Sequence, residues 1–458
     1  MNKFLLIISL WILTFFTDCN NFLNLQPIGS PTEGNFYADE GGLQGALTSC
    51  YDALQNEFLY GNNFLALAEN RGDNVADNNI SSGGGVIYQI DAFTDRSDNK
   101  PITDTWLQLY IVVFRCNMVI ERAPGIKMSA AVRNQIVGQA LFIRALAYFN
   151  ITRLWGKAPL ITKIQTPDEA RNNKRSEISD IYQQVISDLK DAIRYLPDTW
   201  PPGQKGRASS FSSRALLAKA YLYQRKFDLA VSTLQPLVNA IYDGKGAGLV
   251  PQTSTFPNSI KTSADVLFAV QYLAGGVGEG IHQNNRYRFQ DGSIIITIDQ
   301  NLFETGDNRK GLLKPPGGGV ERPEKFNSAV VSNNETSGDM PVLRCAEALL
   351  IYAEALNELG YPNADAFKAI NAVRANAGLS PLDANAAPTQ AHLKNAIWKE
   401  RRLELALECD RWFDIVRTGQ FPAIYPLVPA FKVLYAIPQT EINNINDKTG
   451  WQNDGYEK

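Results

Sequence analysis

The stretch IWKERRLELALECDRWFDIVR, residues 397–417, decides the fold of this chain. Glu400, Glu404 and Glu408 recur at four-residue steps, which places them on one face of a helix. The same stretch carries cationic residues and aromatic packing anchors, namely Arg401, Arg402, Arg411, Trp398, Trp412 and Phe413. An acid–base cluster is one interpretation, but carboxylates paired with arginine keep their charge at neutral pH. We therefore predict a helix over 397–417 that ion pairs lock against its neighbours, without a catalytic role.

Further helical runs lie upstream of this stretch. Apolar residues repeat at three- and four-residue steps within 131–153, and every fourth residue from Ile181 to Ile193 is apolar. Residues 212–238 and 346–377 each have the spacing of two short antiparallel helices of a tetratricopeptide repeat. Such hairpins cannot bury their apolar faces alone, so they stack. The sequence predicts an all-α fold, a tetratricopeptide-like helical-repeat scaffold with long loop-rich insertions.

The insertions are two long segments, about residues 60–105 and 242–340, that are rich in Gly, Asn, Asp and Pro. Loops of this length in a compact body are usually functional or disordered, and a rigid scaffold commonly positions them for binding. We therefore expect the ligand contacts in these two segments. The ligand-binding candidates, chosen by residue type, are Arg71, Asp73, Asn74, Asp77, Tyr88, Phe93, Asn284, Arg286 and Tyr287.

These residue types suit a sugar, because an aromatic ring can stack on a pyranose while guanidinium, amide and carboxylate groups bind its hydroxyls. Glu69, Asp73 and Asp77 also fall at four-residue steps, and glycosidases use paired carboxylates. Gly72 and the neighbouring asparagines favour a turn over a helix here. Sugar binding, catalysis by these carboxylates and a solvated loop without a ligand are the three interpretations. Binding ranks above catalysis.

Composition argues against several other function classes. The formal net charge is −3 and no long basic run is present, so nucleic-acid binding is not expected. The chain has only two histidines, His282 and His392, far apart in the sequence, and we predict no metal site and no cofactor. The glycine-rich segment 275–280 lacks the spacing of a dinucleotide fingerprint, and the glycine triplets lack the Lys-Ser/Thr of a phosphate loop.

The N-terminus indicates export. Residues 1–18 have the form of a signal peptide, and their apolar run is shorter than the about 20 residues that cross a bilayer. Cys19 follows where a bacterial lipoprotein carries its lipid, although Asp18 replaces the usual small residue; an ordinary cleaved signal is the alternative. The remaining cysteines are Cys50, Cys116, Cys345 and Cys409. Because they lack metal-ligand spacing, we predict buried thiols.

Taken together, these motifs resemble the SusD/RagB family. The matching segments are Cys19–Leu23 with Pro27, Ala140–Phe149, Leu154–Leu160, Gly206–Ala208, Ala215–Leu222, Arg344–Glu347, Tyr352–Ala355, Asn371–Arg374, Glu400–Leu405, Arg411–Arg417 and Ile437–Ile442. The resemblance spans nearly all of the chain after the signal peptide and implies a single domain over 19–458. Each motif alone is unspecific, whereas their order along the chain is specific.

The resemblance implies a non-catalytic protein that captures an oligosaccharide and delivers it to a SusC-type TonB-dependent outer-membrane transporter. It also implies a lipid anchor at Cys19 in the outer membrane of a Bacteroidetes-type cell, displayed at the cell surface. Family members often carry acidic residues after that cysteine, where this chain has Asn20 and Asn21. The sequence therefore does not decide whether the protein lies on the outer or the inner face of the outer membrane. Peptide or protein binding on the same scaffold is the alternative, and the motifs do not identify the ligand.

Overall fold

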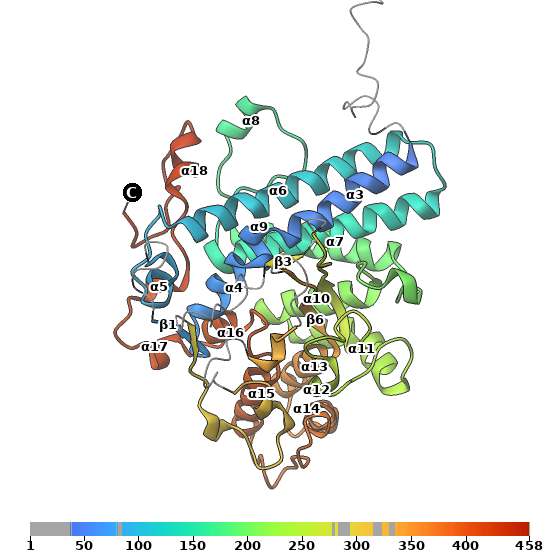
Figure 1. The fold of residues 1–458 in the computed structure, drawn as a ribbon, viewed down its shortest axis with the longest axis vertical. Helices are drawn as coiled ribbons and strands as arrows, with labels where there is room; N and C mark the ends of the chain where they lie inside the picture. Colours follow the sequence, from blue (N-terminus) through green and yellow to red (C-terminus); the bar gives the residue numbers. More distant parts are fainter. Residues whose placement is uncertain are drawn as a thin grey trace, which may run out of the picture.

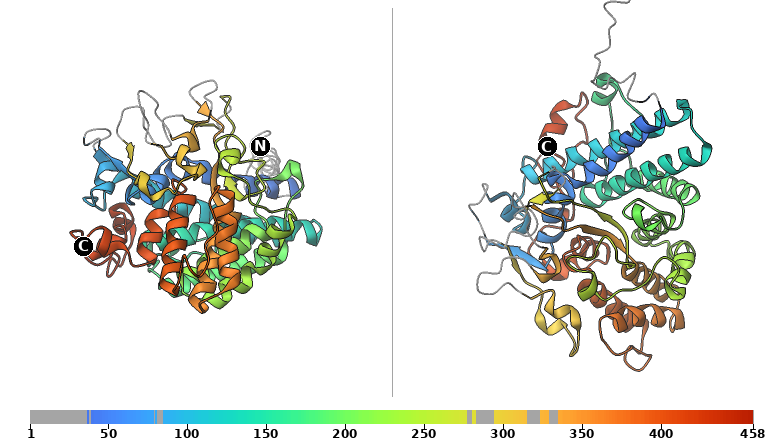
Figure 2. Two further views of the ribbon diagram at one scale, coloured as in Figure 1. Left: turned by 90° about the horizontal axis from the view of Figure 1, so that it is seen from below. Right: turned by 45° about the vertical axis from the view of Figure 1, so that its right-hand side comes forward.

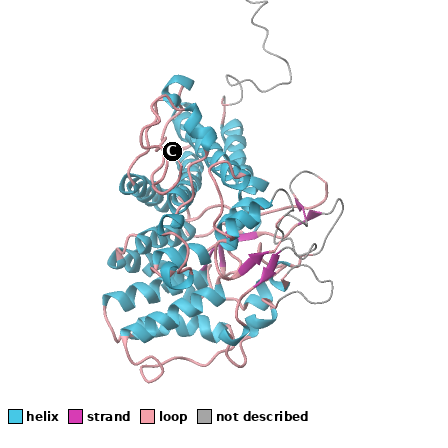
Figure 3. Cartoon of the chain, turned by 90° about the vertical axis from the view of Figure 1, so that its left-hand side faces the viewer, coloured by secondary structure: helices cyan, strands magenta, loops and turns pink. Residues whose placement is uncertain are grey.

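The computed structural model describes residues 37, 39–78, 80, 85–276, 280–282, 294–314, 323–328 and 335–457. The predicted signal peptide and Cys19 lie outside these residues, as do Asn284, Arg286 and Tyr287, and those predictions stay predictions. Helices dominate the described part, and its strands form three two-stranded sheets (Figure 1 and Figure 3). None of its helices is long and apolar enough to cross a membrane. The predicted all-α scaffold is confirmed.

Four long helices form one layer of the molecule, at the top of Figure 1. They are α3 (Glu40–Gln55), α6 (Lys100–Arg122), α7 (Ala130–Trp155) and α9 (Ile178–Tyr195). α7 packs against both α6 and α9, and every residue from Gly138 to Thr152 is buried. A helix covered on all sides needs apolar residues on all sides, which explains its sequence. At its end, the Trp155 ring meets Trp106 of α6 edge-on, with centroids 5.1 Å apart.

The predicted repeat hairpins are present and stack. Their helices are α10 (Ser210–Tyr223), α11 (Phe227–Asp243), α13 (Cys345–Leu359) and α14 (Ala364–Asn376), followed by α15 (Gln390–Glu404). α9 contacts α10, α11 contacts α13, and α13 contacts α15, so segments far apart in sequence lie side by side (Figure 2). Ser209 starts α10 with a capping box, in which its hydroxyl accepts the Ser212 N–H and the Ser212 hydroxyl accepts the Ser209 N–H.

The stretch 397–417 is not one helix, so that prediction is wrong. α15 ends at Glu404, and a second helix, α16 (Arg411–Arg417), begins after a turn. Leu407 and Cys409 in that turn both have a φ of 66°, in the left-handed region that ends helices. The periodic spacing of apolar and charged residues continues across the turn, but the helical backbone is interrupted there.

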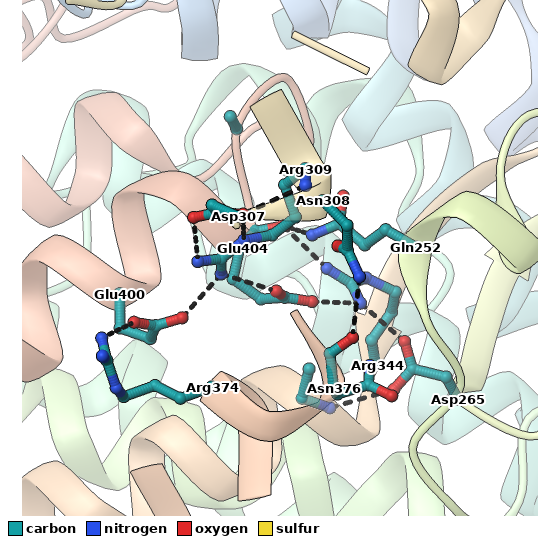
Figure 4. Close-up of polar contacts among 12 residues, drawn as sticks. Gln252, Asp265, Asp307, Asn308, Arg309, Arg344, Arg374, Asn376, Glu400 and Glu404 are labelled. Atoms are coloured by element: carbon teal, nitrogen blue, oxygen red, sulfur yellow. Dashed lines mark hydrogen bonds and ion pairs between the residues drawn. The ribbon is translucent and has the colours of Figure 1, made fainter. Parts of the chain in front are cut away.

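The ion pairs predicted for this stretch are present, although most of their partners come from distant segments (Figure 4). Glu400 pairs with Arg309 and Arg374, Glu404 with Arg309 and Arg344, and Glu408 with Arg344 and Lys325. Burial disfavours the charge on Glu404, but Arg344 and Arg309 outweigh it and lower its pKa to about 2. The network therefore joins α15 and the turn after it to α14, which supplies Arg374, and to the segment 309–344, which supplies Arg309, Lys325 and Arg344.

The first insertion contains more regular structure than predicted. Its elements are the π-helices η2 (Glu57–Gly61) and η3 (Ala66–Asn70), α4 (Asn63–Leu65), β1 (Val75–Asp77) and α5 (Val86–Asp91). The loop prediction for 60–105 is thus wrong in part, because Phe64, Leu67 and Ala68 are buried in the core and order the backbone around them.

The second insertion consists of short elements joined by loops. These elements are α12 (Gln252–Thr255), β2 (Val266–Val270), β3 (Ile281–His282), β4 (Ile294–Ile296), η7 (Gln300–Leu302), η8 (Asn308–Gly311), η9 (Glu324–Phe326), β5 (Glu335–Thr336) and β6 (Met340–Arg344). The strand pairs are β1 with β4, β2 with β6, and β3 with β5, all antiparallel. The remaining elements are η5 (Ala123–Gly125), α8 (Pro167–Arg171), η6 (Pro202–Gln204), α17 (Phe421–Ile424), η11 (Ala430–Val433) and α18 (Gln439–Asn444).

The four cysteines of the described part are buried free thiols, as predicted. Cys50 lies in α3, Cys116 in α6 and Cys345 at the start of α13. Cys409 lies in the turn before α16 and not in a helix.

Candidate functional site

The pairing of β1 with β4 brings the two predicted ligand-binding segments together. Val75 faces Ile296 in the register of this sheet. Thr297 extends the contact, since its N–H donates to the Asn74 carbonyl at 2.9 Å and its hydroxyl donates to the Asp73 carbonyl at 3.1 Å. We call residues 69–77, 86–93 and 294–298 the β1–β4 region. In this region the two insertions contact each other through both backbone and side-chain atoms.

Asp73 is the most strongly held carboxylate of this region. Arg411 donates to it twice, at 2.5 and 3.0 Å, and Arg402 lies 3.1 Å away. Burial disfavours the charge, but these guanidinium groups outweigh it and lower the pKa of Asp73. Its side chain stays 24% exposed. A fixed, charged and partly accessible carboxylate can accept a hydrogen bond from a ligand hydroxyl but cannot donate a proton.

Arg71 and Phe93 lie in the interior. Arg71 pairs with Asp95, donates to the Lys432 carbonyl at 3.1 Å, and lies over the Tyr435 ring, 3.7 Å from its centroid. Phe93 packs edge-on against Tyr425, with centroids 4.9 Å apart. Neither side chain offers a ligand much surface in this structure, because each is committed to the core.

Asn74, Asp77 and Glu69 are also buried, so the interpretation of this segment as a solvated loop is wrong. The Asn74 amide oxygen accepts from Arg402 at 3.1 Å. Glu69 is fully enclosed and accepts the Cys409 N–H at 2.8 Å. Burial raises the pKa of Glu69 to about 8. A protonated, enclosed Glu69 cannot meet a substrate.

Asp91 is a carboxylate that sequence analysis missed. It accepts the Asp77 N–H at 3.3 Å. Burial raises its pKa to about 7, and the neighbouring Asp77 charge contributes to the rise. No spacing in the sequence links the two residues, since their proximity depends on how α5 packs beside β1.

Tyr88 lies on α5 and is half-buried, so part of its surface stays accessible. Of the candidates in the described part, Asp73 and Tyr88 keep partial exposure, whereas the other four are buried: Arg71, Asn74, Asp77 and Phe93. The guanidinium groups of Arg402 and Arg411 reach this region from the C-terminal stretch and were missed, because only the tertiary fold places them beside Asp73.

Asp73 and Glu69 do not form the carboxyl pair of a glycosidase. Glycosidases need one carboxyl that gives a proton and another that faces the scissile bond. Asp73 is held charged by two arginines and Glu69 is enclosed, so these two cannot form such a pair. Among the described residues, no group of three or more His, Cys, Asp or Glu side chains could hold a metal ion.

Known proteins resemble this chain along most of its length. A family model described as "Starch-binding associating with outer membrane" matches residues 43–222, and a model of the "SusD family" matches residues 319–453. SusD-like protein P2 of Formosa agariphila is 27% identical, with 91% of each chain covered. A SusD-like protein of Bacteroides ovatus is 23% identical, with 91% of this chain and 82% of the relative covered.

Solved protein structures with similar folds also superpose on this chain. A laminarin binding SusD-like protein superposes with a TM-score of 0.77 at 25% identity, covering 92% of this chain and 100% of that chain. Surface glycan-binding protein A from Bacteroides fluxus gives the same TM-score at 20% identity, with 92% and 100% covered. At that lower identity the second similarity concerns the fold alone.

Proposed function

Because this chain belongs to the SusD/RagB family, we propose that it captures an oligosaccharide without cleaving it. The similarity to a laminarin binding protein and to a model described as starch-binding supports a carbohydrate ligand. The proposal includes a lipid anchor at Cys19 in the outer membrane, display at the cell surface and delivery of the sugar to a SusC-type TonB-dependent transporter. The model's description as associating with the outer membrane supports that location.

The observation that carries the proposal is the meeting of the two insertions at the β1–β4 region. There the half-buried ring of Tyr88 lies on α5, and the fixed carboxylate of Asp73 lies at the adjoining turn. Sugars need both elements, a flat apolar surface for a ring face and fixed polar groups for hydroxyls. Because Arg402 and Arg411 already hold Asp73, little side-chain freedom is lost when a ligand binds. Asn284, Arg286 and Tyr287 are proposed as further contacts.

Calorimetric titration of the protein without its lipid tests this proposal. Neutral oligosaccharides from β- and α-glucans are added to the wild type and to Tyr88→Ala and Asp73→Asn. We expect saturable binding and no released product, and we expect each substitution to weaken binding about tenfold, equivalent to about 1.4 kcal/mol. Tyr242→Ala, which removes an exposed ring from α11, is the matched control and should bind as the wild type does.

Two results would contradict the proposal. Slow hydrolysis of a glycan by purified protein would assign it to enzymes. Saturable binding of peptides, with no glycan bound, would favour the alternative of a peptide-binding lipoprotein. The partnership has its own test, because co-purification with a TonB-dependent transporter from native outer membranes supports delivery, and recovery without one contradicts it.

A further inference from the structure

A cavity of about 330 Å³ opens between α3, the middle of α7, the turn after η6 and β2. Its size lies at the lower end of the range for small-molecule sites. None of the described residues that line it belongs to the β1–β4 region. The cavity is therefore a separate place in the fold, and the proposed function does not use it.

Five amide side chains line this cavity, beside apolar residues such as Leu54 and Phe268. The amides belong to Gln44, Gln55, Gln139, Gln204 and Gln271. The Gln44 and Gln204 amides make no hydrogen bond to another described residue, and both side chains keep exposed surface. An amide offers both a donor and an acceptor, which is what a sugar hydroxyl needs.

The back of the cavity is rigid. The Tyr51 hydroxyl donates to the Gln139 amide oxygen at 2.9 Å and accepts the Ala208 N–H at 3.0 Å. The Gln55 amide donates to the Gln271 carbonyl at 2.6 Å. Such bonds hold the wall in one arrangement before a ligand arrives, which reduces the entropy lost on binding.

The charge of the cavity has one sign. Lys205 and Arg207 line it, and none of its described lining residues is acidic. Neither cation forms an ion pair with another described residue: the Lys205 ammonium donates to the Thr262 carbonyl at 3.0 Å, and the Arg207 guanidinium lies 5.4 Å from the Trp200 ring centroid. Lys205 and Arg207 also line a smaller adjoining cavity of about 70 Å³ together with Asp198, and no ion pair joins Asp198 to either cation. Two cations without an ion-pair partner in the described structure, on a wall that is otherwise neutral, favour an anionic ligand.

We propose that this cavity is a second ligand site, which takes a sugar unit bearing a carboxylate or a sulfate ester. Arg207 and Lys205 bind the anionic group, and the Gln44 and Gln204 amides bind ring hydroxyls. The choice of a sugar rests on the proposed function, whereas the choice of an anion rests on the charge of the cavity. A chain with both sites can hold an acidic polysaccharide at two separate points.

The test uses the whole protein without its lipid, saturated with a neutral glucan oligosaccharide, in calorimetric titrations at 50 and 300 mM NaCl. The added probes are an oligogalacturonate and a sulfated galactan oligosaccharide of equal length, and the response to each identifies which anionic group is accepted. We expect one of them to bind despite the neutral ligand and to bind several-fold more weakly at high salt. Arg207→Gln and Lys205→Gln should each weaken it about tenfold and leave the affinity for the neutral glucan unchanged.

The control is Arg194→Gln, which removes the same charge from an exposed position on α9. Equal binding by the Arg194→Gln and Arg207→Gln variants, with unchanged melting temperatures, would overturn the inference by reducing it to non-specific charge attraction. So would the failure of both anionic probes to bind a protein that still binds neutral glucan. A third outcome is that neutral glucan does not bind, whereas an anionic probe binds and Arg207→Gln weakens that binding. This result would support the cavity as a binding site and would contradict the proposed binding of neutral oligosaccharides at the β1–β4 region.

Discussion

Replacement of Arg344 by Met tests whether the buried ion network holds the scaffold together. Arg344 ends β6 and is 1% exposed. Its guanidinium lies 2.6 Å from Asp265, 2.9 Å from Glu404 and 2.8 Å from Glu408. Methionine fills a similar volume but leaves these carboxylates without their shared cation.

The size of the effect follows from the burial of those carboxylates. Removing one partner of a buried pair costs about 3–5 kcal/mol, because the charge left behind has lost both water and its counter-ion. In Arg344→Met this applies to Asp265, whereas Glu404 and Glu408 keep Arg309 and Lys325. Unfolding entropy near 60 °C is about 2.1 cal/mol/K per residue, or about 1 kcal/mol/K for a chain of 458 residues. The Arg344→Met variant should therefore melt about 3–5 °C below the wild type.

Calorimetric melting, together with urea denaturation, measures this loss. Arg194→Met is the control, since the Arg194–Asp191 pair is exposed by 65% and 44% and is worth less than about 1 kcal/mol. Melting of Arg344→Met within 1 °C of this control would contradict the expected loss of stability. That result would mean that the network contributes no more than a surface pair.

Three further substitutions have defined outcomes in urea denaturation. Burial raises the pKa of Glu69 from 4.5 to about 8, so the folded state keeps a proton that the unfolded chain releases. Glu69 should therefore make stability fall as pH rises from 4.5 to 8, by up to about 1.4 kcal/mol per unit. Burial also raises the pKa of Asp91 to about 7 and that of Asp265 to about 6, so Glu69→Gln should reduce the measured slope without abolishing it; equal slopes in the two proteins would exclude the raised pKa of Glu69. Gly156→Ala should cost about 1–3 kcal/mol, because φ is 72° there and a Cβ would lie 2.9 Å from Leu434 Cδ1; an unchanged midpoint would contradict that strain. Ser209→Ala removes the cap of α10 and should cost about 1 kcal/mol, whereas no loss would show the cap to be dispensable.

The helices could be predicted from the sequence because their signal is local. The periodicity from Ile181 to Ile193 gives α9, and the alanine-rich runs give the hairpin helices. The break after Glu404 could not be predicted, since distant side chains stabilise it. Lys325 donates to the Glu404 and Ala406 carbonyls at 3.2 and 2.9 Å, and thus satisfies groups that a continuous helix would have satisfied itself.

The site was less predictable than the scaffold. The two insertions were predicted to carry the ligand contacts, and the structure shows that β1 pairs with β4 to join them. Arg71 and Phe93 were chosen as residue types that suit a sugar, but a polar or aromatic residue in a loop-like segment can equally pack inside. The cavity beside Tyr51 had no sequence signal, because Gln139 and Arg207 approach it from separate helices and turns.

Whether the protein binds sugars without cleaving them can be measured by titrating the purified protein without its lipid against a panel of neutral and anionic oligosaccharides, with product analysis of each mixture. We expect saturable binding of at least one oligosaccharide, weakened about tenfold by Tyr88→Ala, with every ligand recovered intact. Cleaved sugar, or a panel in which no oligosaccharide binds while peptides do, would contradict it.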